Sequence, residues 1–381
     1  MQIKYVLFII VAILLVSCNR DHSENGKSSN VKLQSSDLEY ARGFEIINQS
    51  NYKKVTIYNP WQGAEDVNYE YLLVNKDKKL NEDIEDFNVI RTPVERVICL
   101  STTHIAFIDI LNETQSIISV SGTDYVNNSK IRERIDNNEI QDVGYDNSLN
   151  YELIASLNPD LVLTFGVSGQ VAGYTQKLND LGIQTMIIAE YLEMHPLGKL
   201  EWIKLISALY EKDNIAKVYF NKIVNEYNEL SKVTRNISNK PRILLGLPWK
   251  GSWFVPGGNS FLAKMIHDAG GDYIWKENES RESLPFDIEF IFAKASDADI
   301  WINAGTINKK EDIVKLDERF KDFPPYNKKI YNNNSQLNKS GGNNYWEQGL
   351  VEPHIVLKDM IKVFHPELLP EHELVYYKII E

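Results

Sequence analysis

One stretch decides the fold, because the chain contains it twice. The first copy is Glu152-Leu-Ile-Ala-Ser-Leu-Asn-Pro-Asp160-Leu-Val-Leu-Thr-Phe-Gly166, and the second is Glu289-Phe-Ile-Phe-Ala-Lys-Ala-Ser-Asp-Ala-Asp299-Ile-Trp-Ile-Asn-Ala-Gly305. Each copy reads as an acidic residue, a short helix, an aspartate and an apolar strand that ends at glycine. A unit present once in each half of the chain predicts two matched lobes with a cleft between them.

The regions around the repeat predict an α/β fold. Strand and helix patterns alternate over 94–212 and again over 241–381, which is typical of βαβ units. Between them, 213–240 has apolar residues at i, i+3, i+4 and i+7, the period of an amphipathic helix. Residues 37–93 hold short β-like runs separated by turn residues. We therefore expect two Rossmann-like lobes joined by a single long α-helix, preceded by a β-meander extension.

The N-terminus predicts export. Residues 1–18 contain a basic residue, Lys4, an apolar run too short to span a bilayer, and the ending Leu15-Val16-Ser17-Cys18. This ending resembles the bacterial lipobox, in which the cysteine becomes the lipidated N-terminus. Residues 19–36 are rich in Ser, Asn and Lys and read as a flexible tether. We expect a protein anchored to a bacterial membrane, on its periplasmic side or at the cell surface, through Cys18.

Composition and motifs argue against several classes of function. The net charge of −12 argues against nucleic acid, because no basic stripe exists to neutralise phosphates. No phosphate-binding loop occurs, and Phe165–Gly169 lacks the spacing of a serine nucleophile elbow. No His pair has metal-ligand spacing, and the run around Cys99 predicts a buried, inert thiol. We expect no catalysis, no resident metal and no intrinsic cofactor.

Three blocks resemble the substrate-binding proteins of ABC importers for iron–siderophore, haem and cobalamin uptake. They are Asn158-Pro-Asp160-Leu-Val162 after its helix, Gly257–Ser260 through Ala269–Asp272, and Leu284–Gly305. The resemblance covers residues 94–366. It implies a monomer that captures a ferric siderophore or related metal chelate and delivers it to a permease dimer with its ATPase subunits. A cobalamin- or haem-binding member of the same family is an alternative. A permease-independent lipoprotein that scavenges or senses chelates is another.

The resemblance also implies a role for the leading acids of the repeat. In this family one acidic residue per lobe meets arginine pockets on the permease, which by position are Glu152 and Glu289 here. A paired receptor needs similar charges on both lobes, which supports the same assignment. The alternative is that each glutamate stabilises the first turn of its helix through the helix dipole.

Ligand contacts are expected beyond the carboxyl ends of the parallel strands. Aromatic side chains in these loops suit a large flat or apolar chelate, although each of them could instead be core. The candidate ligand-binding residues are Thr103, Tyr125, Gly166, Tyr191, Lys250, Trp253, Tyr345 and Trp346.

Overall fold

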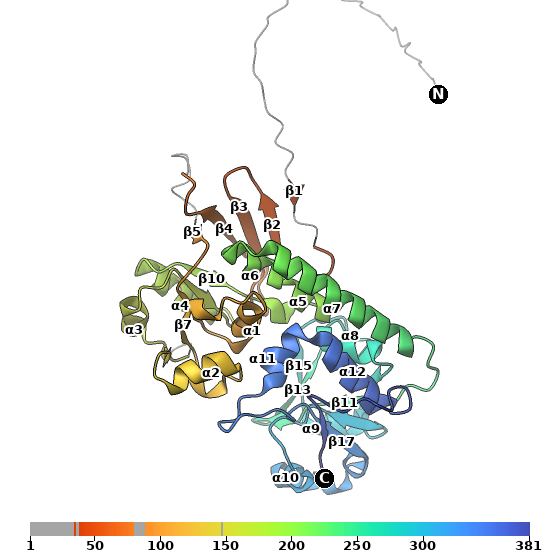
Figure 1. The fold of residues 1–381 in the computed structure, drawn as a ribbon. Coiled ribbons are helices and arrows are strands. Elements are labelled where there is room, and N and C mark those ends of the chain that lie inside the picture. The colour runs from red at the N-terminus through yellow and green to blue at the C-terminus, as the bar shows by residue number, and fades with distance from the viewer. Residues whose placement is uncertain (1–33, 36–37, 80–87, 146–147) are drawn as a thin grey trace, which may run out of the picture. The chain divides into compact units, whose positions relative to one another are not determined.

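The computed structural model of the protein describes residues 34–35, 38–79, 88–145 and 148–381 (Figure 1). The chain from 33 to 381 forms one compact unit. Two of its sheets are built mainly from parallel strands flanked by helices. This confirms the α/β class that the alternating pattern predicts.

The extension forms a five-stranded sheet in the order β1-β2-β3-β4-β5. Strands β2, β3 and β4 pair antiparallel, as a meander does, whereas β5 joins β4 in parallel. The parallel β5 was not anticipated from the sequence. The strands are β1 (Gln34–Ser35), β2 (Phe44–Asn48), β3 (Lys53–Tyr58), β4 (Asn68–Asn75) and β5 (Asn88–Thr92).

The first lobe contains a fully parallel sheet in the order β10-β9-β6-β7-β8. Every residue of β6, β9 and β10 is buried, as expected for a parallel sheet that helices cover on both faces. The elements are β6 (Val97–Cys99), α1 (Thr102–Ile110), β7 (Ile117–Val120), α2 (Ser129–Asp136), β8 (Gln141–Asp142), α3 (Tyr151–Ser156), β9 (Leu161–Thr164), α4 (Gln170–Asp180) and β10 (Thr185–Ile187).

The second lobe contains a mixed sheet in the order β14-β11-β16-β17-β18 and a smaller sheet in the order β12-β13-β15. Only β18 runs antiparallel in the larger sheet. The elements are β11 (Arg242–Leu245), β12 (Pro248–Trp249), β13 (Ser252–Pro256), α8 (Phe261–Asp268), β14 (Asp272–Tyr273), β15 (Ser283–Phe286), α9 (Ile288–Lys294), β16 (Ile300–Ile302), α10 (Lys310–Leu316), β17 (Lys329–Asn332), α11 (Asn344–Val351), α12 (Pro353–Phe364) and β18 (Lys378–Ile379).

Three helices connect the lobes: α5 (Pro196–Glu201), α6 (Ile203–Tyr210) and α7 (Asp213–Thr234). Helix α7 has 22 residues and is therefore about 33 Å long. It contacts α1, α5 and α6 on one side of the molecule and α12 on the other. In Figure 1 it is the long green helix that reaches from α6 to α12.

The sequence repeat occupies matching places in the two large sheets. Helix α3 leads into β9, which pairs with β6, the first strand of its lobe. Helix α9 leads into β16, which pairs with β11, the first strand of the second lobe. Asp160 accepts the backbone N–H of Arg96 at 3.2 Å, and Asp299 accepts that of Arg242 at 2.9 Å. In each copy of the repeat, the equivalent aspartate thus accepts a hydrogen bond from the backbone at the start of its lobe's first strand.

The C-terminal helical segment has two parts, α11 and α12, with a break at Glu352. Pro353 causes the break, because it lacks an N–H to continue α11 yet fits the first turn of α12. Helix α11 then packs against α1 of the first lobe, which makes it a bridge between the lobes.

Candidate functional site

A cavity of about 730 Å³ lies between the lobes, beyond the carboxyl ends of their parallel strands. The first lobe contributes Thr102, just after β6, and Tyr125, in the loop after β7. The second lobe contributes most of the wall, from the ends of β11, β16 and β17 and from the small sheet. This is the position that open α/β sheets provide for a ligand.

Two aromatic side chains face the cavity from opposite lobes. Tyr125 is half exposed and meets Tyr145 edge to face, with ring centroids 6.3 Å apart. Trp346, on α11, is half exposed and meets Tyr345 at 4.8 Å. Phe254 is a third exposed ring in the lining. A flat or apolar ligand would find stacking surfaces on both sides.

Amide side chains form the polar part of the wall. Asn334 donates from Nδ2 to the carbonyl of Ile307 and to Oδ1 of Asn308, at 3.2 and 3.1 Å. Asn303 accepts the hydroxyl of Tyr377 at 2.8 Å. The cavity is lined by five such residues: Asn303, Asn308, Asn333, Asn334 and Asn343. The hydrogen bonds fix several of these amides in one orientation before any ligand arrives.

A clasp, made of Asn338, Gly342 and Glu347 on the second lobe and 124–128 on the first, closes one rim of the cavity. Glu347 accepts the backbone N–H groups of Asn127 and Asn128, both at 2.7 Å. Asn338 donates to the carbonyls of Asp124 and Val126, at 2.9 and 3.0 Å. A side chain on Gly342 would meet the carbonyl of Tyr125 at 2.4 Å, so only glycine fits there. The clasp therefore fixes the loop that carries Tyr125.

Glu347 itself is almost fully buried, and burial raises the pKa of its carboxyl to about 7. The two backbone N–H groups oppose this rise in pKa, because they stabilise the carboxylate. Nearby Asp109 adds to the rise through charge repulsion.

A turn of the extension, 61–63, spans the two lobes elsewhere along the cleft. The Gln62 N–H donates to the carbonyl of Val167 in the first lobe at 3.1 Å. The Gly63 N–H donates to the carboxylate of Glu282 at 2.9 Å, next to the cavity residue Ser283. The predicted ligand residues Gly166 and Tyr191 lie at this turn, where the Tyr191 hydroxyl donates to the Gly166 carbonyl at 3.2 Å. They do not line the cavity with Tyr125 and Trp346.

Thr103 is turned toward a buried polar group, while its neighbour Thr102 lines the cavity. Thr103 bonds to the side chains of Ser101, at 2.9 Å, and Glu190. Burial raises the pKa of Glu190, and Lys199 opposes that rise. Lys199 in turn lies 3.9 Å above the ring of Phe261 in the second lobe. These residues pack the lobes together behind the cavity.

Three other predicted contacts lie away from the cavity surface. Trp253 is fully buried, stacks on Trp301 at 5.6 Å and donates to the carbonyl of Leu245, so the expectation that it contacts ligand is corrected to a core role. Tyr345 is buried behind Trp346. Lys250 lies at the exposed tip of the β12–β13 hairpin, 4.4 Å above the ring of Trp249.

The leading acids of the repeat lie on the surface, in the first turns of α3 and α9. Glu289 is paired with Arg319 at 2.6 Å, and the hydrogen bond from Arg319 lowers the pKa of its carboxyl. Asp317 holds the same guanidinium at 2.6 Å. For Glu152 we find no ion-pair partner among the described residues. The surfaces around Glu152 and Glu289 therefore occupy matching places on the two lobes but differ in local charge, because a cation is paired with Glu289.

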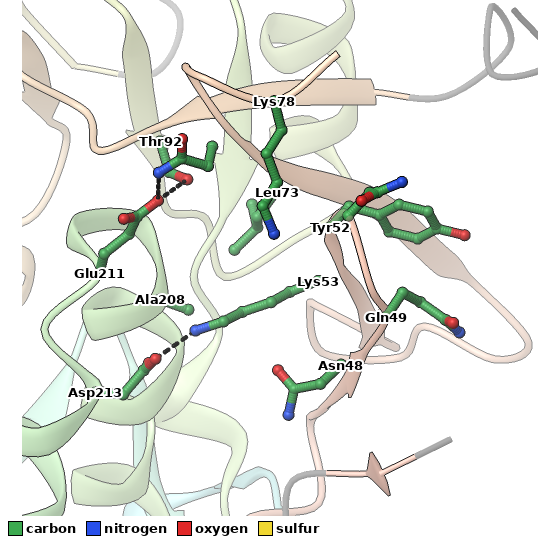
Figure 2. Close-up of a pocket in the computed structure, with 12 residues that line it drawn as sticks. Asn48, Gln49, Tyr52, Lys53, Leu73, Lys78, Thr92, Ala208, Glu211 and Asp213 are labelled. Atoms are coloured by element: carbon green, nitrogen blue, oxygen red, sulfur yellow. Dashed lines mark hydrogen bonds and ion pairs between the residues drawn. The ribbon is translucent and has the colours of Figure 1, made fainter. Parts of the chain in front are cut away.

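A second cavity, of about 390 Å³, lies where the extension meets the α6–α7 junction (Figure 2). Lys53 pairs with Asp213 at 2.5 Å. Glu211 accepts from the Asn75 amide at 2.7 Å and the Thr92 hydroxyl at 2.8 Å. One ion pair and two hydrogen bonds to Glu211 thus cross the junction and fasten the extension to the start of α7.

Comparison with known proteins identifies the family. Residues 97–331 match the family described as periplasmic binding protein. The chain belongs to this family. A lipoprotein of Methanocaldococcus jannaschii is 30% identical to it over 95% of this chain and 92% of its own length.

Solved structures of periplasmic binding proteins share the fold. A possible iron-binding protein of Staphylococcus epidermidis superposes with a TM-score of 0.53 and 15% identity, over 71% of this chain and 98% of its own. A periplasmic haem-binding protein of Pseudomonas aeruginosa superposes with a TM-score of 0.54 and 13% identity, over 76% and 98%. Periplasmic binding proteins bind solutes and are not enzymes, which agrees with the motifs that the sequence lacks.

The part of the chain that the structure describes holds neither a cluster of metal ligands nor a membrane-spanning helix. No group of three or more His, Cys, Asp or Glu residues there could hold a metal ion. In that same part of the chain, no helix is both long and apolar enough to cross a bilayer. The signal segment, the tether and Cys18 fall outside the described residues.

Sequence reasoning missed the asparagines of the binding cavity. The rule that ligands gather at the carboxyl ends of strands points to Asn303 and Asn333, which follow β16 and β17 directly. The sequence-based prediction favours aromatic residues over amides as ligand contacts, because the expected ligands are large and flat. The strand-end rule, applied to every polar residue, would have found the amides.

Proposed function

We propose that this periplasmic binding protein captures a metal chelate in the interlobe cavity and delivers it to an ABC permease in the membrane. The observation that carries the proposal is the cavity of about 730 Å³ with an exposed aromatic side chain from each lobe, Tyr125 and Trp346. A ferric siderophore is the first candidate, with haem and cobalamin as alternatives. The iron- and haem-binding proteins that share the fold support a ligand of this class.

Ligand binding is tested by tryptophan quenching with ferric siderophores, haemin and cyanocobalamin. Tyr125→Ala and Trp346→Ala should each weaken binding of the successful chelate about tenfold or more, because each removes a stacking face. Trp249→Ala is the matched control, since Trp249 is exposed but lies outside the cavity lining. Absence of binding to all these chelates would disprove the proposal.

The proposed docking residues are Glu152 and Glu289, one on each lobe. Reversing both charges to lysine should abolish chelate uptake in cells and leave the affinity of the purified protein unchanged, because neither residue lines the cavity. Glu229→Lys is the control: Glu229 is an exposed helical glutamate paired with a cation, as Glu289 is. Normal uptake by the double variant would exclude this docking role.

The proposed anchor is a lipid on Cys18. Cys18→Ser should release the exported protein from the membrane fraction, because acyl chains supply the attachment. Continued membrane association of this variant would contradict the anchor.

A further inference from the structure

The wall of the interlobe cavity is uncharged. Among the described residues that line it there is no Asp, Glu, Lys, Arg or His. Its polar side chains are amides and hydroxyls, such as Asn303, Asn343, Thr306 and Ser283. At the edge of the wall, the ammonium of Lys378 donates to Oδ1 of the lining residue Asn308 at 2.9 Å, in an exposed position. A charged ligand would therefore lose water in the cavity without gaining a counter-ion from its wall.

One amide oxygen in this wall is ready to accept a hydrogen bond. Asn334 is 2% exposed, and its Nδ2 is engaged by Ile307 and Asn308. That engagement fixes which end of the amide is oxygen. Its Oδ1 accepts no hydrogen bond from any described residue. Buried acceptors are normally satisfied, so a ligand N–H or O–H that reaches this oxygen would supply the missing hydrogen bond.

Taking the proposed function as given, we propose that the ligand is an electrically neutral chelate whose periphery carries amide or hydroxyl groups. Such a ligand needs no counter-ion, can donate to Asn334 and can stack on Tyr125 and Trp346. A neutral ferric trihydroxamate and a corrin with amide side chains both fit this chemistry. A ferric tris-catecholate, which is anionic, and haem, which carries two carboxylates, do not.

The first experiment measures affinities of the purified protein for four probes: ferrichrome, cyanocobalamin, ferric enterobactin and haemin. We expect at least one of the two neutral probes to bind about 100-fold more tightly than either anionic probe, because an uncharged wall discriminates against unpaired charge. Tighter binding of an anionic probe would overturn this inference and leave the chelate-binding function intact. Binding of none of them would overturn the proposed function itself.

The second experiment changes the charge of the wall at Thr306, whose exposed side chain lines the cavity. Thr306→Lys and Thr306→Asp should change the affinity for the neutral probe in the same direction and by similar factors, because neither charge acts on an uncharged ligand. The same pair should move the affinity for ferric enterobactin in opposite directions, with lysine favouring it. Opposite effects of the pair on the preferred probe would show that it binds as an ion, contrary to the inference.

The third experiment removes the unpaired acceptor. Asn334→Ala should weaken the neutral probe about tenfold or more, because the ligand's donor loses its partner. Asn239→Ala, at an exposed asparagine away from the cavity, should have no effect. Circular dichroism of both variants confirms that they are folded. Unchanged affinity in a folded Asn334→Ala protein would contradict the role of Asn334.

Discussion

At the scale of single residues, Glu347 joins binding geometry to pH. It belongs to the second lobe, yet its carboxyl holds two backbone N–H groups of the first. Its folded pKa of about 7 lies above the ordinary glutamate pKa of 4.5, so the folded protein holds this proton more tightly than the unfolded chain does. The contribution of Glu347 to the free energy of unfolding therefore falls as the pH rises from about 4.5 to about 7, and then stays constant.

We predict that Glu347→Ala removes this part of the pH dependence. The wild-type protein should lose about 3 kcal/mol of unfolding free energy from this residue between pH 4.5 and pH 7.5, and the variant should not. Urea unfolding of both proteins at pH 5 and pH 8 measures the difference. Because other titrating groups are common to both proteins, only the difference between the two slopes is informative. Equal slopes would contradict the prediction.

The residue scale also shows where sequence reasoning stops. Tyr125 and Trp346 are predicted ligand contacts, and both line the cavity. Trp253 is also a predicted contact, but its neighbour Phe254 lines the cavity instead. Successive residues of a strand point to opposite faces, so one step of register exchanges core for cavity. Thr102 and Thr103 also have different surroundings, because successive residues of a helix point about 100° apart. Aromatic content identified the segments, but the exposed member of each pair depends on tertiary packing.

At the scale of elements, the extension is fastened by two buried glutamates. Glu201 accepts the backbone N–H groups of residues 39–41, at 2.8 to 3.0 Å. Glu193 accepts those of Arg42 and Gly43, together with the indole N–H of Trp202. Gly43 passes so close to Trp202 that a side chain there would meet the ring at 2.9 Å. Carboxylates from α5 and from the segment before it thus replace the sheet partners that this segment lacks.

We predict that Glu201→Ala lowers the free energy of unfolding by about 3 kcal/mol, because buried N–H groups would lose their acceptor. Glu201→Gln keeps one acceptor oxygen and should cost less. Chemical denaturation measures both values, and hydrogen exchange should show faster exchange of the amides in 39–41 in the alanine variant. A loss below about 0.5 kcal/mol would mean that this contact does not hold the extension.

Elements with local signals were the easiest to anticipate. The period of apolar residues predicts α7, and the alternation in β2, β3 and β4 predicts the antiparallel part of the extension. The parallel pairing of β5 with β4 has no such signal, because it depends on a crossover rather than on a turn. The polar contacts of Glu201 are also invisible in sequence, since the two partners lie more than 150 positions apart.

At the scale of the whole molecule, the extension and both lobes share one hydrophobic core. Phe44 of β2 packs against Trp202 with ring centroids 4.8 Å apart, and the Tyr71 hydroxyl accepts the backbone N–H of Ile187 in the first lobe. The family model matches residues 97–331, which leaves the extension outside it. The structure nevertheless makes the extension part of the same folded unit.

We predict that a chain starting at Val94 does not fold, because it would expose the apolar surface that β2 to β4 cover. A chain starting at Leu38 keeps the segment held by Glu193 and Glu201 and should unfold at the same denaturant concentration as the mature protein. Circular dichroism and urea titration compare the two. A folded chain from Val94 that still binds the chelate would show that the extension is an independent addition.

If the cavity holds the proposed ligand, the clasp at Glu347 and the turn at 61–63 affect how long that ligand stays bound. The clasp links the lobes directly and the turn links them through the extension, so separation of the lobes breaks these contacts. Residence time would then depend on how often the lobes separate, whereas the equilibrium constant depends on the cavity wall. A permease that pulled on the two lobes could shorten residence without altering a single contact to the cargo.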